Sequence, residues 1–188
     1  MFAALALYFV PFWLLAAYFV ACLVHELCHV IALRLSRVKI CSFMVELKGL
    51  VIEHEKITSV WFELFCILAG PMGGIIFSYA CSLLALSVAS DWLDICSAVS
   101  LILSIFNLLP CKPLDGGRAL GCVAGLVFKE KTAALLTFMS GIAVGGLLLV
   151  LSISALSKGY GYGAAAAAIC IILNLLFEEG IVKIAELR

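Results

Sequence analysis

Long apolar runs dominate this chain and leave few folds open to it. A helix rises about 1.5 Å per residue, so about 20 apolar residues cross the ~30 Å hydrocarbon core of a bilayer. The hydrophobic fraction is 65% and the mean hydropathy is +1.24, whereas about half of a typical soluble domain is apolar. We therefore predict an all-α polytopic membrane protein, a single domain over residues 1–188, with about five transmembrane helices. The five predicted spans are residues 2–33, 59–89, 95–109, 132–156 and 164–177.

The segment between the first two spans has a different pattern. In residues 38–56, β-branched and apolar residues alternate loosely with polar ones on either side of Lys48 and Gly49. Alternation of this kind around a turn is typical of two paired strands. We predict a short β-hairpin there. A second glycine-rich stretch, residues 69–74 with Pro71, predicts a kink or a close helix contact inside the second span.

The distribution of positive charge predicts how the chain is oriented in the membrane. With five spans, all of the twelve Lys and Arg residues except Lys158 fall on one side. Basic loops stay on the cytoplasmic side of a cell membrane. We therefore expect the N-terminus outside and the C-terminus inside. The formal net charge is zero, which gives no reason to expect a nucleic-acid partner.

Cysteine usage and the first residues of the chain carry less information. The nine cysteines include no CxxC pair, and most stand in apolar runs, so we expect small buried side chains and no disulfide framework. No basic segment precedes the first apolar run. We therefore expect a retained span and not a cleaved signal peptide.

The chemistry is concentrated at His25-Glu26-Leu27-Cys28-His29, inside the first predicted span. Residues four apart on a helix share a face, so both imidazoles point the same way. Two histidines at this spacing with a glutamate beside them are typical of a metalloprotease, in which the glutamate is the general base. Packing alone is a poor alternative explanation, because ionisable residues at membrane depth are costly.

A catalytic zinc needs a third protein ligand and an open position for water. His54 stands among charged residues of the predicted hairpin and is better explained as a solvated side chain. Asp115 is the stronger candidate, since it follows the third span at the same end to which the first span carries His25 and His29. We place it in a tight loop, residues 111–118, followed by a short helix over 119–128.

HELCH together with NLLPCKPLDGG (residues 107–117) resembles the site-2 protease family of intramembrane metalloproteases. AGP at residues 69–71 and FEE at 177–179 extend the likeness to about residues 21–179, closest to the stage IV sporulation protein FB type. The resemblance implies Zn²⁺ held by His25, His29 and Asp115, with Glu26 as the catalytic base. It further implies that Asn107 binds substrate or the oxyanion, although a helix end capping its own turn explains Asn107 as well.

The resemblance also implies a function. The chain would hydrolyse peptide bonds in or near a transmembrane segment of a membrane-tethered protein, such as a sigma-factor precursor or another transcription regulator. The active site would face the cytoplasmic side, and sporulation is one setting. Membrane inhibitor or regulator proteins are expected partners. No segment of residues 1–188 has the length of a PDZ or CBS domain, so neither is expected.

Alternatives follow from the same residues. A metal-binding pseudoprotease acting as a membrane scaffold would need no Glu26, which is present. A small transporter would show an internal repeat, and none is visible.

Cys28 replaces the glycine usual in the motif, so a thiol from Cys28 or Cys111 as fourth ligand or redox brake is conceivable. A fully ligated zinc, however, has no place for water. The hairpin would clamp an unwound substrate by strand addition, or it is a simple cytoplasmic loop.

Overall fold

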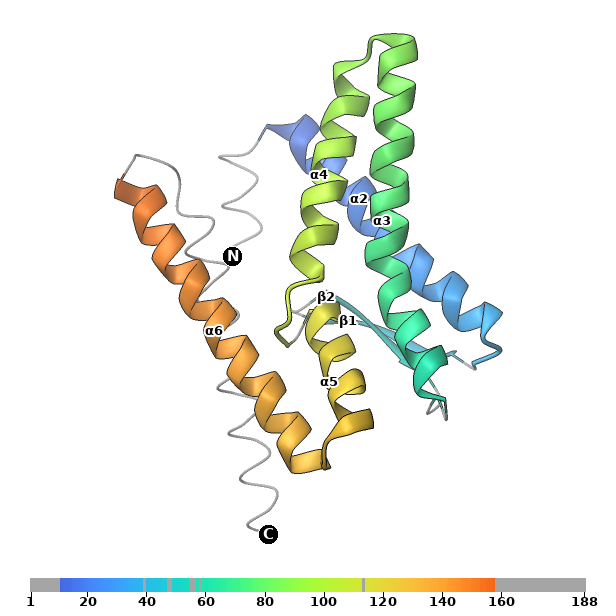
Figure 1. Ribbon diagram of the computed structural model, residues 1–188. Helices are drawn as coiled ribbons and strands as arrows, with labels where there is room; N and C mark the ends of the chain where they lie inside the picture. Colours follow the sequence, from blue (N-terminus) through green and yellow to red (C-terminus); the bar gives the residue numbers. More distant parts are fainter. Residues whose placement is uncertain are drawn as a thin grey trace. The chain divides into compact units, whose positions relative to one another are not determined.

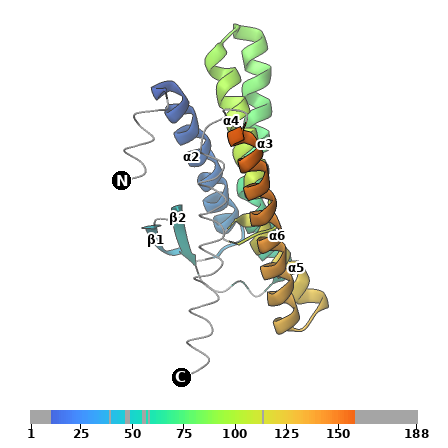
Figure 2. The ribbon, with the colours of Figure 1, turned by 90° about the vertical axis from the view of Figure 1, so that its left-hand side faces the viewer.

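A computed structural model describes residues 11–38, 40–46, 49–54, 57, 59–112 and 114–157 of the chain. These residues belong to two compact units, Met1–Asn107 and Leu108–Arg188, and each is described by itself (Figures 1 and 2). The predicted span 164–177 and the FEE motif lie outside the described residues.

The described part of the first unit holds three helices, α2 (Phe12–Leu35), α3 (Val60–Val88) and α4 (Asp91–Asn107), and two strands. α3 and α4 run antiparallel, side by side, and α2 packs against both (Figure 1). The first predicted span therefore begins, as a described helix, directly after Pro11, which occupies the N-cap position. Proline fits the start of a helix because it lacks the N–H that an interior position would need.

The chain between the end of α2 and the start of α3 forms a pair of strands. β1 (Ile40–Glu46) and β2 (Gly49–His54) pair antiparallel, with Phe43 opposite Ile52 and Glu46 opposite Gly49. Both strands fall within residues 38–56. The register shifts between Ile40 and Ser42, which marks a local irregularity of the bulge type.

Two helices form the described part of the second unit: α5 (Asp115–Val127) and α6 (Glu130–Ser157), which pack against each other. α5 begins four residues earlier than the predicted helix, so the prediction that Asp115 stands in a loop is wrong. In the sequence, Gly116 and Gly117 predict a tight turn. In the structure they lie in the first turn of α5, where the backbone of the preceding loop leaves no room for a Cβ.

The sequence also predicts a short polar loop at residues 91–94, between the second and third spans, and this prediction is wrong. α4 already begins at Asp91, and the backbone carbonyl of Ser90 accepts hydrogen bonds from the N–H groups of Leu93 and Asp94. Acidic side chains are favoured in the first turn of a helix, near the positive end of its dipole. Asp91 and Asp94 occupy that turn, so their polarity marks a helix start and not a loop.

Three of the described helices are long and apolar enough to cross a membrane, by length and composition: Phe12–Leu35, Val60–Val88 and Glu130–Ser154. Their surfaces expose large apolar side chains, including Phe19, Ile76 and Leu147. A helix that is apolar on all sides needs a membrane or a protein core around it. α4 is shorter, with 17 residues, or about 26 Å of helix.

A row of buried serines joins α3 to α4 inside the first unit. Ser100 Oγ donates to the Gly74 carbonyl (2.9 Å), and Ser78 Oγ donates to the Ser97 carbonyl (2.7 Å). A Cβ on Gly74 would collide with the Ser104 hydroxyl. Small residues and interhelical hydroxyl bonds of this kind hold helices together in lipid, where burial of apolar surface gives no net attraction. The glycine-rich centre of α3 is thus a close helix contact.

Candidate metal centre

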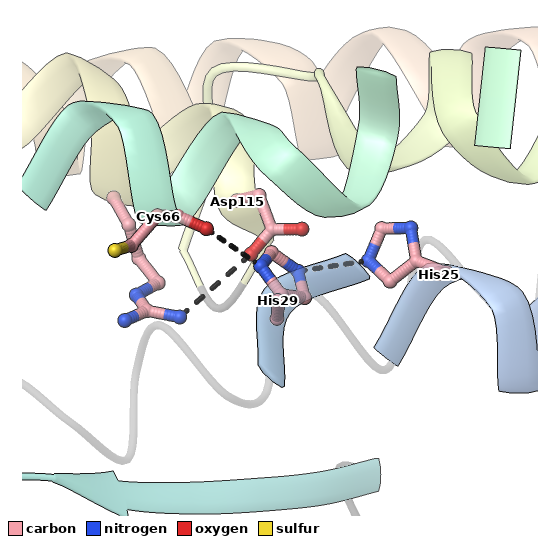
Figure 3. A network of polar contacts seen from close by, with 5 residues as sticks. His25, His29, Cys66 and Asp115 are labelled. Atoms are coloured by element: carbon pink, nitrogen blue, oxygen red, sulfur yellow. Dashed lines mark hydrogen bonds and ion pairs between the residues drawn. The ribbon is translucent and has the colours of Figure 1, made fainter. Parts of the chain in front are cut away.

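The two histidines of α2 lie together, as their spacing predicts. Their Nε2 atoms are 3.2 Å apart and their ring centroids 4.8 Å apart, with an interplanar angle of 79° (Figure 3). His25 is buried, with 5% of its surface exposed. The two Nε2 atoms therefore converge on one point beside the helix.

A carbonyl of the neighbouring helix orients His29. Its Nδ1 lies 2.8 Å from the carbonyl oxygen of Cys66 on α3 (Figure 3). A carbonyl accepts only, so Nδ1 is the protonated nitrogen of His29, and Nε2 presents its lone pair. Metal-binding histidines almost always donate their second ring N–H to a carbonyl or carboxylate in this manner. The structure thus selects the tautomer that a metal ligand requires.

The same helix makes room for the imidazole. A Cβ on Gly70 would fall on the His29 ring, within 2.7 Å of Cδ2, and a Cβ on Gly73 would fall on Cys28. Pro71, directly after Gly70, is buried in the helix interior, where its missing N–H removes one backbone hydrogen bond. Gly70 and Gly73 therefore make room for His29 and Cys28 of the HELCH motif, whereas Gly74 of the same segment faces α4.

The histidine pair fits a zinc ion in both donor type and distance. Zinc binds imidazole nitrogen at about 2.0–2.1 Å in a tetrahedral shell, which places two ligand nitrogens about 3.3 Å apart. The observed 3.2 Å between the Nε2 atoms agrees with that separation. Imidazole is also a preferred ligand of zinc. Glu26, the next residue after His25, is partly buried on the same helix.

Asp115 belongs to the second unit. It is the first residue of α5, it is buried with 7% of its surface exposed, and its Oδ1 lies 3.7 Å from Nη1 of Arg118 (Figure 3). A Cβ on Gly116 would collide with the carbonyls of Leu108 and Leu109. The backbone of the preceding loop thus lies directly on the turn that carries the carboxylate.

Asn107 ends α4, and its side-chain amide donates to the Leu103 carbonyl of its own helix (3.0 Å). This bond corresponds to the alternative explanation of Asn107, a helix end that caps its own turn. The amide oxygen of Asn107 takes no part in it, so the bond leaves an acceptor for another group.

The two cysteines near the motifs differ in their surroundings. Cys28 packs against Gly73, in the first unit. Cys111 is fully buried in the loop before α5, and burial raises the pKa of its thiol to about 11. His54 falls in β2, outside the described histidine pair.

Comparison with known proteins adds one finding. No protein-family model matches the chain, and no curated protein matches it. Among solved structures, the site-2 protease from Methanocaldococcus jannaschii is similar, with a TM-score of 0.66 over 93% of this chain and 79% of that chain. The fold is that of a site-2 protease. At 23% sequence identity, the similarity to the site-2 protease concerns the fold alone. That fold and the three long apolar helices support a membrane protein.

Proposed function

We propose that this protein is an intramembrane zinc endopeptidase. The observation that carries the proposal is the pair of Nε2 atoms 3.2 Å apart in an apolar helix, with His29 held in the ligand tautomer by the Cys66 carbonyl. An ionisable pair at membrane depth is costly without a function. The site-2 protease fold supports the same reading.

Asp115 is the third ligand in this proposal, so that His25, His29 and Asp115 together hold one metal ion. Two neutral imidazoles and one carboxylate form a donor set that catalytic zinc sites use, with one position left for water. The burial of Asp115 at a helix start supports it, because positive charge stabilises a carboxylate taken out of water, and a metal ion would add to the charge of Arg118, 3.7 Å away.

Zinc in such a site acts as a Lewis acid and activates water. Glu26 is the residue of this chain that moves the proton. Its carboxylate accepts a proton from the attacking water and returns it to the leaving amine of the scissile peptide. Asn107 donates to or accepts from the substrate, or stabilises the oxyanion, through its side-chain amide.

The substrate in this proposal is a membrane-tethered protein that is cut in or near its transmembrane segment. Peptide bonds in a helix are shielded by their own hydrogen bonds, so that segment must unwind first. The strands β1 and β2 provide an edge on which an extended segment can add as a further strand. Regulated release of a sigma-factor precursor or another transcription regulator, in a sporulation setting or otherwise, is the biological form of the proposal.

The proposed setting is the cell membrane, with the N-terminus outside, the C-terminus inside and the active site towards the cytoplasm. The charge asymmetry of the sequence supports this orientation. Membrane-bound inhibitors or regulators are proposed partners, because an unregulated protease in this position would cut its substrate continuously.

Cleavage of a purified tethered substrate tests the proposal. We expect the detergent-solubilised protein to cut a substrate whose transmembrane segment carries helix-breaking residues, and to cut a poly-leucine version of it more slowly. A chelator should abolish cleavage and added zinc should restore it. If the protein binds zinc but cuts none of a panel of tethered substrates, a pseudoprotease scaffold replaces the protease proposal.

A further inference from the structure

Ser140 of α6 forms a hydrogen bond that leaves its own helix. Its Oγ donates to the Pro110 carbonyl at 2.7 Å, and it also lies 2.8 Å from the carbonyl oxygen of Thr137. The Thr137 contact alone would satisfy the hydroxyl in an apolar environment, as helical serines commonly do. The bond to Pro110 is therefore an additional feature that links α6 to the loop before α5.

That loop is tightly organised. Cys111 N–H donates to the Leu109 carbonyl (2.8 Å), and Leu114 N–H donates to the Cys111 carbonyl (3.0 Å). The Leu114 carbonyl then accepts from the N–H groups of Gly117 and Arg118, 3.1 Å from each. Loop and helix start thus form one continuous hydrogen-bonded unit, in which Pro110 is followed within five residues by Asp115.

The loop also presses directly on the first turn of α5. Any Cβ on Gly117 would lie on the backbone of Cys111 and Lys112. Backbone in contact with backbone leaves little room for adjustment, because packed interiors transmit small displacements. A shift of the Pro110 carbonyl therefore moves the helix start, and with it the Asp115 carboxylate.

We propose that Ser140 is a positioning residue for Asp115, acting through the Pro110 carbonyl and the loop that seats the first turn of α5. The inference rests on the proposed function, since it takes Asp115 as a metal ligand. Metal sites require their ligands within about 0.5 Å of the productive geometry, and supporting hydrogen bonds provide that precision. Ser140 supplies such support from a neighbouring helix.

Cobalt binding to the full chain tests the inference. The purified protein is stripped of metal and titrated with Co²⁺, whose visible spectrum reports ligand number and geometry. We expect Ser140→Ala to weaken Co²⁺ binding by about 3- to 10-fold, the equivalent of one net hydrogen bond, and to change the spectrum. Ser140→Thr keeps the hydroxyl and should restore both.

Ser152→Ala is the matched control, because Ser152 also lies on α6 but donates to the Leu148 carbonyl of its own helix (2.6 Å). It should behave as wild type. The inference is overturned if Ser140→Ala matches wild type in affinity and spectrum, or if Ser140→Thr fails to restore them. Asp115→Ala, titrated in parallel, separates the two claims: unchanged Co²⁺ binding there refutes the proposed third ligand itself.

Discussion

Glu26→Gln should abolish proteolysis while leaving metal binding intact. Glutamine keeps the size and polarity of the side chain but cannot accept the proton of the attacking water. General acid–base catalysis contributes about 10²- to 10⁴-fold to an enzymatic rate, so cleavage should fall by at least that factor. The metal content should stay at the wild-type value, because His25 and His29 are unchanged. Both quantities are measured on the same purified sample.

Glu130→Gln is the control for this substitution. Glu130 is exposed in the first turn of α6, and its replacement should change neither rate nor metal content. Wild-type cleavage by the Glu26→Gln protein would remove Glu26 from the mechanism. Loss of metal in that protein would instead make Glu26 a ligand.

Gly70→Ala is expected to lower zinc affinity strongly, although it replaces no metal ligand. The new Cβ would lie on the His29 imidazole, so the ring must leave its place and its bond to the Cys66 carbonyl. Loss of a group that orients a metal ligand costs about 10- to 100-fold in affinity, and displacement of the ligand itself should cost at least as much. Zinc affinity, measured by competition with a chromogenic chelator, checks the prediction.

Gly146→Ala separates this effect from general helix effects. A Cβ on Gly146 of α6 meets no atom within 4 Å, so that variant should bind zinc as wild type does. Alanine favours a helix over glycine by about 1 kcal/mol, so Gly70→Ala should not weaken α3 as a helix. A loss of zinc affinity in that variant would therefore come from the collision with His29. Wild-type affinity in Gly70→Ala would contradict the packing described for His29.

Much of the helical fold is readable from the sequence, because apolar length alone defines the long spans. The predicted 59–89 and 132–156 differ from α3 and α6 by one or two residues at each end. The errors fall where polar residues begin a helix. Asp91 and Asp115 each stand in a first helical turn. The sequence predicts loops at both positions, because helix starts and loops favour the same residue types.

The candidate site, too, is only partly predictable from the sequence. The i, i+4 spacing places His25 beside His29, and the glycines after Ala69 predict a close contact, although the sequence does not say that the contact is with His29. No sequence pattern marks the Cys66 carbonyl or the Ser140 hydroxyl as part of a site. Their roles depend on which helices become neighbours, and a lone serine or a backbone carbonyl is common in any apolar helix. Helix packing alone decides them.

The zinc content per chain reports directly on the proposed metal site. It is measured on the purified protein, on Asp115→Ala and on the control Asp94→Ala. Asp94 is exposed in the first turn of α4 and has no part in the proposed site. One zinc per chain is expected in the wild type and in Asp94→Ala, and loss of zinc in Asp115→Ala. A full zinc complement at wild-type affinity in Asp115→Ala would contradict the proposed metal site.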